Sequence, residues 1–91
     1  MPNVREVVAT TQFKKDLKKI LKQGRKAERI QSIVKQLQVG TPLDSKHRPH
    51  QLTGNWRPKL ECHIEPDWLL IYEVTNEELK LIRTGSHSQL F

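Results

Sequence analysis

The chain has 91 residues, a charged fraction of 29% and a formal net charge of +6 at pH 7. This length predicts one domain, spanning residues 1–91, with a small core, and no apolar run is long enough to cross a membrane. The N-terminal residues contain no secretory signal, and the single cysteine, Cys62, cannot form an internal disulfide. These features exclude membrane-spanning and disulfide-scaffold classes and favour a cytoplasmic protein.

The positive charge is spread unevenly along the chain. Residues 1–48 contain twelve of the sixteen Lys and Arg and four of the ten acids, a local balance of +8, whereas residues 49–91 have a balance of −2. A basic half on a small domain favours a polyanionic partner, such as RNA, DNA or an acidic protein segment. A solvated lysine-rich helix would give the same pattern, so charge alone leaves both interpretations open.

The N-terminal part of the chain predicts a strand followed by an amphipathic helix. Residues 4–9 contain three valines, whose β-branched side chains favour a strand. Thr10 and Thr11 offer hydroxyl groups that cap a helix N-terminus, and Gly24 is the predicted end of that helix. Its apolar stripe consists of Phe13, Leu17, Ile20 and Leu21. Five lysines occupy the other face: Lys14, Lys15, Lys18, Lys19 and Lys22.

A second helix is predicted from Lys26 to Val39, because Gly40 is a natural C-terminal stop and Pro42 prevents its continuation. The apolar face of this helix consists of Ala27, Ile30, Val34 and Leu37. The short turn between the two helices predicts an αα-hairpin.

The rest of the chain predicts a long loop and three strands. Residues 41–55 lack periodicity, and a loop of this length is more often a working loop than a simple connection. The predicted strands are Trp56–Ile64, Trp68–Thr75 and Leu79–Thr84, and the tail from Gly85 to Phe91 is too short for another element. The order predicts an α+β fold: an N-terminal strand, the αα-hairpin and a three-strand antiparallel meander, with the helices packed on one sheet face.

Two-residue turns at Pro66-Asp67 and Asn76-Glu77 would fix the register of the meander. Glu65 then pairs with Trp68, and His63, Leu70 and Arg83 align across three strands. The face predicted to meet the helices is wholly apolar: Leu60, Cys62, Ile64, Leu69, Ile71 and Ile82. The face left open to a ligand contains His63, Leu70, Tyr72 and Arg83.

This register also carries the last strand back towards the first turn, so that His87 should end near Asp67 and Trp68. The alignment depends on the turn lengths, and a one-residue bulge would turn His63 inward.

These residues suit metal-free cleavage of RNA through its own 2′-hydroxyl. That reaction needs a base, an acid and positive charge at the phosphorane, and histidine serves the first two because its unperturbed pKa is about 6.5. An aromatic ring can also hold a neighbouring base by stacking. The candidate set is His50, His63, Asp67, His87, Arg83, Trp68 and Phe91. Each residue also has a purely structural explanation as a turn, strand, cap or core residue.

A metal centre or a serine hydrolase site is disfavoured. Cys62 and His63 are adjacent in a strand and point to opposite faces, so they cannot share an ion, and His47-x-x-His50 lacks a second close pair. The chain has no nucleophile elbow and no phosphate-cradling glycine loop. We therefore expect no metal and no cofactor.

The C-terminal half resembles the YafQ group of bacterial toxins, within the RelE/ParE superfamily of toxin–antitoxin systems. Four segments of the sequence carry the resemblance: Pro42-Leu43, His50-x-Leu52-x-Gly54-x-Trp56, His63-Ile64-Glu65-Pro66-Asp67-Trp68 with Leu70-Ile71-Tyr72, and Arg83-Thr84-Gly85-Ser86-His87 through Leu90-Phe91. The helical half matches in pattern rather than in motif.

The resemblance implies a RelE-like fold and a ribosome-dependent endoribonuclease that cuts translated mRNA. It implies a catalytic set at His50, His63, Asp67 and His87, and substrate placement by Trp68 and Phe91. We expect His87 to be the general acid and Asp67 or His50 the general base.

Two classes of partner follow from the resemblance: mRNA and ribosomal RNA on the one hand, and a cognate antitoxin protein on the other. The lysine-rich helix face would suit either RNA phosphates or the antitoxin. Two other functions stay open at this point. One is a ParE-like gyrase poison without nuclease activity, and the other is a non-catalytic RNA-binding module.

Overall fold

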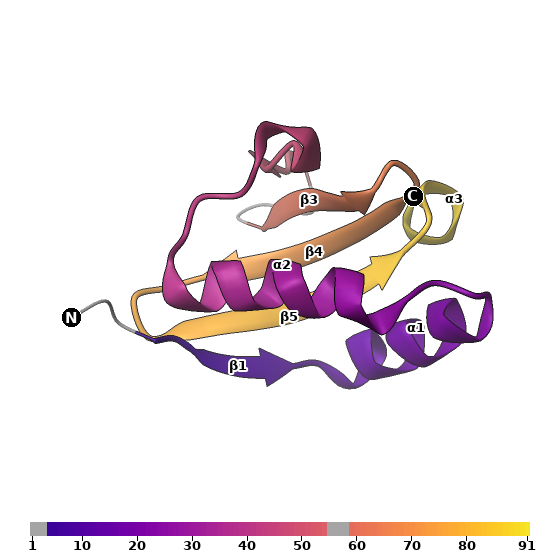
Figure 1. Ribbon diagram of the computed structural model, residues 1–91, viewed down its shortest axis with the longest axis horizontal. Coiled ribbons are helices and arrows are strands. Elements are labelled where there is room, and N and C mark those ends of the chain that lie inside the picture. Colours follow the sequence, from indigo (N-terminus) through magenta and orange to yellow (C-terminus); the bar gives the residue numbers. More distant parts are fainter. Residues whose placement is uncertain (1–3, 55–58) are drawn as a thin grey trace.

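The computed structural model describes residues 4–54 and 59–91. A five-stranded sheet of order β1-β5-β4-β3-β2 is covered on one face by two helices, α1 and α2 (Figure 1). In chain order the elements are β1 (Glu6–Ala9), α1 (Thr11–Lys22), α2 (Ala27–Val39), the 3-10 turn η1 (Ser45–His47), β2 (His50–Gln51), β3 (Leu60–Glu65), β4 (Trp68–Val74), β5 (Glu78–Gly85) and α3 (His87–Leu90). The predicted α+β fold is confirmed.

Both predicted helices form, and their ends follow from local chemistry. Thr10 caps α1, since its hydroxyl accepts a hydrogen bond of 2.9 Å from the backbone N–H of Phe13. Gly40 ends α2 in the left-handed conformation with φ 80°, where a side chain would be strained. Neither these helices nor any other in the described part of the chain is long and apolar enough to cross a membrane.

The αα-hairpin follows the edge strand β1 and precedes the segment that leads to β2 at the opposite edge of the sheet. Strand β1 pairs in parallel with β5, with Val7 opposite Leu79, and the hairpin packs on the sheet through contacts of α1 with β5 and of α2 with β3 and β5. The other strand pairs are antiparallel. The predicted meander therefore forms, and β1 extends it beyond its last strand.

Two segments predicted to be irregular contain structure. The loop after α2 includes η1 and the short strand β2, which pairs with β3. The tail folds into α3, because Ser86 and Gln89 form a reciprocal capping box and Leu90 is buried at 7% exposure. The strand predicted from Trp56 begins at Leu60, and Trp56 itself lies outside the described residues.

The register differs from the prediction because two strands contain bulges. Both two-residue turns are confirmed, since Glu65 pairs with Trp68 and the Thr75 N–H donates to the Glu78 carbonyl oxygen at 2.9 Å. Just before the first turn, however, the pairing of β3 with β4 shifts at Ile64. His63 therefore lies opposite Leu69 and not opposite Leu70 as predicted.

A second shift falls in β5, at Ile82. Ile71 pairs with Arg83, whereas its neighbour Tyr72 pairs with Leu81, so Ile82 is the extra residue. Leu70 consequently lies opposite Thr84 rather than Arg83.

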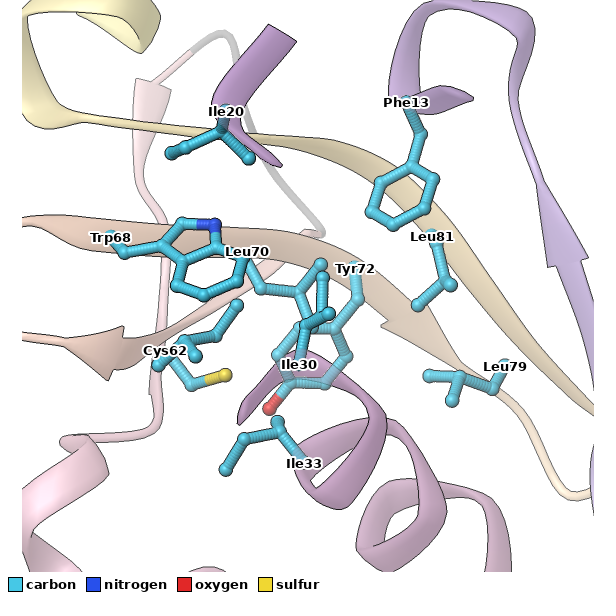
Figure 2. Packing of buried hydrophobic residues seen from close by; sticks show 11 residues of the cluster. Phe13, Ile20, Ile30, Ile33, Cys62, Trp68, Leu70, Tyr72, Leu79 and Leu81 are labelled. Carbon is cyan, nitrogen blue, oxygen red and sulfur yellow. The ribbon is translucent and has the colours of Figure 1, made fainter. Parts of the chain in front are cut away.

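The bulges exchange the faces predicted for β4. Trp68, Leu70 and Tyr72 point into the core under the helices, as Figure 2 shows. Leu69 and Ile71, predicted to face the helices, instead form a second apolar cluster with Leu90, and Ile82 packs against it. The prediction is correct for Leu60, Cys62 and Ile64. The helix-facing core consists of Phe13, Ile20, Ile30, Ile33, Cys62, Ile64, Trp68, Leu70, Tyr72, Leu79 and Leu81.

Candidate active site

The site lies on the sheet face that the two long helices leave open. Its apolar floor is the cluster of Leu69, Ile71 and Leu90, which attaches α3 to the sheet. Figure 1 shows α3 beside the turn between β3 and β4. Strands β2 and β3 supply polar side chains from one side, and α3 supplies them from the other.

Glu61 is a buried carboxylate held between two histidines. Only 4% of the residue is exposed, and its Oε1 lies 3.3 Å from His50 Nε2 and 3.6 Å from His63 Nε2. The pairing of β2 with β3 places His50 opposite Glu61, and His63 lies two residues further along the same strand face. Because a buried carboxylate needs polar or charged partners, the two imidazoles explain how it is tolerated there.

Glu61 was not predicted as a site residue. The available signal was its spacing of two from His63, which puts both side chains on one face of any strand. The short strand β2, which brings His50 to the same place, has no comparable signal in the sequence.

Each of these histidines is also fixed through its other ring nitrogen. His50 Nδ1 lies 2.8 Å from the carbonyl oxygen of Arg48, and His63 Nδ1 lies 3.3 Å from that of Pro66. A carbonyl oxygen only accepts hydrogen bonds, so these contacts place a proton on Nδ1 and turn Nε2 towards Glu61. His47 stabilises the same region, with its Nδ1 2.7 Å from the His63 carbonyl oxygen.

The predicted approach of His87 to Asp67 is confirmed. The backbone N–H of His87 donates to Asp67 Oδ1 at 3.1 Å, which joins the first turn of α3 to the β3–β4 turn. The His87 ring lies 5.4 Å from the ring of Phe91, tilted by 44°, and Phe91 is 52% exposed. An imidazole, a carboxylate and an accessible aromatic ring therefore meet at this end of the sheet.

The prediction that Trp68 contacts substrate is wrong, because its side chain lies in the core under the helices. The residue is fully buried, and its Nε1–H donates to the Thr84 hydroxyl oxygen at 2.9 Å. That hydroxyl in turn donates to the Leu69 carbonyl oxygen at 2.7 Å. The indole thus joins β4 to β5 and has no exposed face on which a base could stack.

Arg83, also predicted to bind substrate, forms a bidentate ion pair with Asp16 of α1. Its Nε and Nη2 lie 2.9 and 3.1 Å from the two carboxylate oxygens, and the Asp16 side chain is 10% exposed. Burial raises the pKa of Asp16, but hydrogen bonds from Arg83, Gln12 and the Thr84 N–H, with the charge of Arg83, outweigh it and lower that pKa overall. The ion pair joins α1 to β5. It engages the Arg83 guanidinium, which was predicted to bind substrate.

The five lysines of α1, predicted to contact RNA phosphates or a partner, are all exposed. Lys15 and Lys19 line a cavity of about 240 Å³ that also includes Asp16 and Arg83. The basic helix face is therefore available to a large anionic partner.

Within residues 4–54 and 59–91, no group of three or more His, Cys, Asp or Glu side chains is arranged to hold a metal ion. Cys62 is buried, and burial raises the pKa of its thiol to about 12, so it is not a nucleophile at neutral pH. The chemistry that the described groups can perform is proton transfer and electrostatic stabilisation by imidazoles and carboxylates.

Residues 5–91 match the family described as a bacterial toxin of type II toxin-antitoxin system, YafQ. A protein of Escherichia coli K12 named mRNA interferase toxin YafQ is 34% identical over 88 residues, which are 96% of this chain and 96% of that protein. The E. coli YafQ chain crystallised with DinJ has a TM-score of 0.89 at 34% identity, covering 97% of this chain and 98% of its own.

A copper-bound mutant toxin from Helicobacter pylori has a TM-score of 0.90 at 39% identity, and the match covers 96% of this chain and 99% of that chain. Sequence and fold thus agree with these relatives over nearly their full length.

Proposed function

The chain belongs to the YafQ family of bacterial type II toxins, and from this premise we propose that it is an mRNA interferase that cuts translated mRNA in the ribosomal decoding site. The observation that carries the proposal is the gathering of three histidines and two carboxylates around one open sheet face. A gyrase poison or a simple RNA-binding module would not need this set of proton-transfer groups.

The reaction is attack of the 2′-oxygen on the adjacent phosphorus, with loss of the 5′-oxygen. A base takes the 2′-hydroxyl proton, an acid protonates the leaving 5′-oxygen, and the products end in a 2′,3′-cyclic phosphate and a 5′-hydroxyl. His87 is the general acid and Asp67 the general base, and the hydrogen bond of 3.1 Å from the His87 backbone N–H to Asp67 Oδ1 holds the two residues at the same end of the sheet. His50 is the alternative base. No metal takes part, although copper is bound in the Helicobacter relative.

His50 and His63 orient and stabilise the phosphate, and Glu61 positions both rings. The carboxylate lies between their Nε2 atoms, and the carbonyl oxygens of Arg48 and Pro66 fix the opposite edge of each ring. Imidazole rings held in this way are already in position when negative charge builds on the phosphorane. Phe91, exposed beside His87, stacks on a base of the mRNA.

The E. coli YafQ relative forms a complex with DinJ, and we propose that this chain likewise has a cognate antitoxin. The exposed lysines of α1 bind either ribosomal RNA phosphates or that antitoxin. The protein acts in the cytoplasm, where ribosomes translate mRNA.

Alanine substitutions test the catalytic set. The four variants at His50, His63, Asp67 and His87 would be assayed for single-turnover cleavage on programmed ribosomes, after unfolding curves show that each is folded. The expected loss is about 10²–10⁴-fold for His87→Ala, the usual contribution of a positioned acid or base. Full cleavage by His87→Ala would exclude it as the acid, and gyrase inhibition with intact mRNA would replace the proposal with the ParE-like alternative.

A further inference from the structure

A cavity of about 510 Å³ adjoins the active site and has no role in the chemistry described so far. It lies between α2, the η1 turn and the end of β3. The side chains that matter for its chemistry are Arg29, Lys46, Arg48, His63, Glu65 and Pro66. Because His63 lines the cavity and also contacts Glu61 at 3.6 Å, the cavity and the catalytic groups share a wall.

The cavity is lined by more cations than acids, and two of these cations have no acidic partner within the ranges that the structure describes. Its one carboxylate, Glu65, is paired with Arg25 and lies 3.9 Å from Arg29. Among the residues that the structure describes, no carboxylate forms an ion pair with Lys46 or Arg48. Two cations are therefore left to attract an anionic ligand.

Arg48 links this charge to the catalytic histidines. It is the one non-glycine residue in the described part of the chain with positive φ, at 47°, a conformation in which glycine or asparagine would be less strained. Its backbone carbonyl oxygen fixes His50 at 2.8 Å, while its side chain lines the cavity. Arg48 thus contributes both to the cavity and to the position of the His50 ring.

We propose that this cavity binds a phosphodiester of the mRNA strand next to the scissile phosphate. The proposal rests on the proposed function, because it extends the RNA strand past His63 into a pocket of matching charge. Lys46 and Arg48 supply the contacts, and Glu65, held by Arg25, keeps Arg29 at the rim. A phosphate of the messenger is favoured over one of ribosomal RNA because the pocket is continuous with His63.

A double-mutant cycle between protein and mRNA tests the contact directly. The protein variants are Lys46→Gln and Arg48→Asn, since asparagine tolerates positive φ, and Lys35→Gln on the exposed face of α2 is the matched control. The mRNA carries one uncharged methylphosphonate, placed in turn at each phosphate flanking the cut. Single-turnover cleavage is measured on programmed ribosomes.

Neutralising one flanking phosphate should slow wild-type cleavage by about tenfold, the usual effect of losing one charge-assisted contact. Lys46→Gln or Arg48→Asn should slow cleavage of unmodified mRNA similarly and show almost no further loss with that methylphosphonate. Lys35→Gln should behave as wild type. The subsite would be overturned if, at every methylphosphonate position, the loss from the protein substitution simply multiplied the loss from the methylphosphonate. This holds even if the variants are slow, because Lys46 and Arg48 would then contact ribosomal RNA and not the message. Failure of the wild type to cut unmodified mRNA would instead overturn the proposed function.

Discussion

Glu61, held between two histidines, is buried where removing its charge from water is unfavourable. The carboxylate is almost inaccessible to water, yet each imidazole contact, at 3.3 and 3.6 Å, goes to the same oxygen. Both rings are anchored at Nδ1 by backbone carbonyl oxygens, so Glu61 sets the direction of Nε2 in each. At the scale of single residues, the site is therefore organised by a carboxylate that need not touch the RNA.

Replacing Glu61 with glutamine should slow cleavage by about 10²-fold while the apparent KM changes little, because misplaced catalytic rings act on the chemical step. Single-turnover rates over a range of toxin concentrations on programmed ribosomes separate the two effects. Glu73→Gln, which removes a half-exposed partner of Lys59, is the matched control and should be near wild type. A Glu61→Gln enzyme with wild-type rate would show that the rings need no such support.

Trp68 offers a second test at the residue scale. Trp68→Phe removes the hydrogen bond to Thr84 and part of the core volume, so the free energy of unfolding should fall by about 2 kcal/mol. Cleavage per folded molecule should stay within about twofold of wild type. Denaturant unfolding and ribosome cleavage on the same samples check this, and unchanged stability with a large loss of cleavage would restore a substrate role for the indole.

At the scale of elements, the sequence predicts which segments are helices and strands better than how they face one another. Helix caps, apolar stripes and two-residue turns are local, and Thr10, Gly40 and Pro66-Asp67 behave as their residue types dictate. The bulges at Ile64 and Ile82 depend on how β3, β4 and β5 pack together. One extra residue reverses the faces of a neighbouring strand, so the predicted open face was wrong for Leu70 and Tyr72.

The link between α1 and β5 should depend on pH. Since the pKa of Asp16 is lowered in the folded protein, its ion pair with Arg83 stabilises the fold above the ordinary value of 3.8, and this stabilisation is lost as the carboxylate protonates below it. Asp16→Asn should lower the free energy of unfolding by about 1–2 kcal/mol at pH 7, because the partly buried Arg83 is left without its partner.

Urea unfolding across pH checks this prediction. The gap between wild type and Asp16→Asn should narrow as the pH falls below 3.8. Asp44→Asn is the control, because asparagine caps η1 about as well as aspartate does. If the difference in free energy of unfolding between wild type and Asp16→Asn did not change with pH, side-chain packing and not charge would hold α1 to β5.

Helix α3 should depend on its cap, because it has only four residues. Ser86→Ala removes the hydroxyl that accepts from the Gln89 N–H and should cost about 1 kcal/mol locally, which lowers the equilibrium constant for ordering α3 about fivefold and reduces cleavage by at most about that factor. Ser88→Ala, in the same helix, should leave cleavage unchanged. Hydrogen exchange of the last residues would report the loss of order, and equal effects of both substitutions would contradict the role of the cap.

At the scale of the whole molecule, the two faces of the sheet carry different groups of residues. One face carries α1, α2 and the larger core, while the other carries the histidines, Glu61 and α3 over a small apolar floor. The sequence predicts the convergence of Asp67 and His87, because antiparallel strands return the chain to the same end. It does not predict the buried environment of Glu61, since that depends on β2, which is too short to have a pattern of its own.

The central claim is that this protein cuts mRNA through the 2′-hydroxyl of the message, with His87 as the acid. The most direct measurement uses programmed ribosomes carrying mRNA with either a 2′-hydroxyl or a single 2′-O-methyl group at the cut nucleotide, and determines the rate and the chemistry of the new ends. Cleavage should require the 2′-hydroxyl, leave a 2′,3′-cyclic phosphate and a 5′-hydroxyl, and fall at least about 100-fold in His87→Ala. A 5′-phosphate product, or cleavage of the 2′-O-methyl message at the normal rate, would contradict the claim.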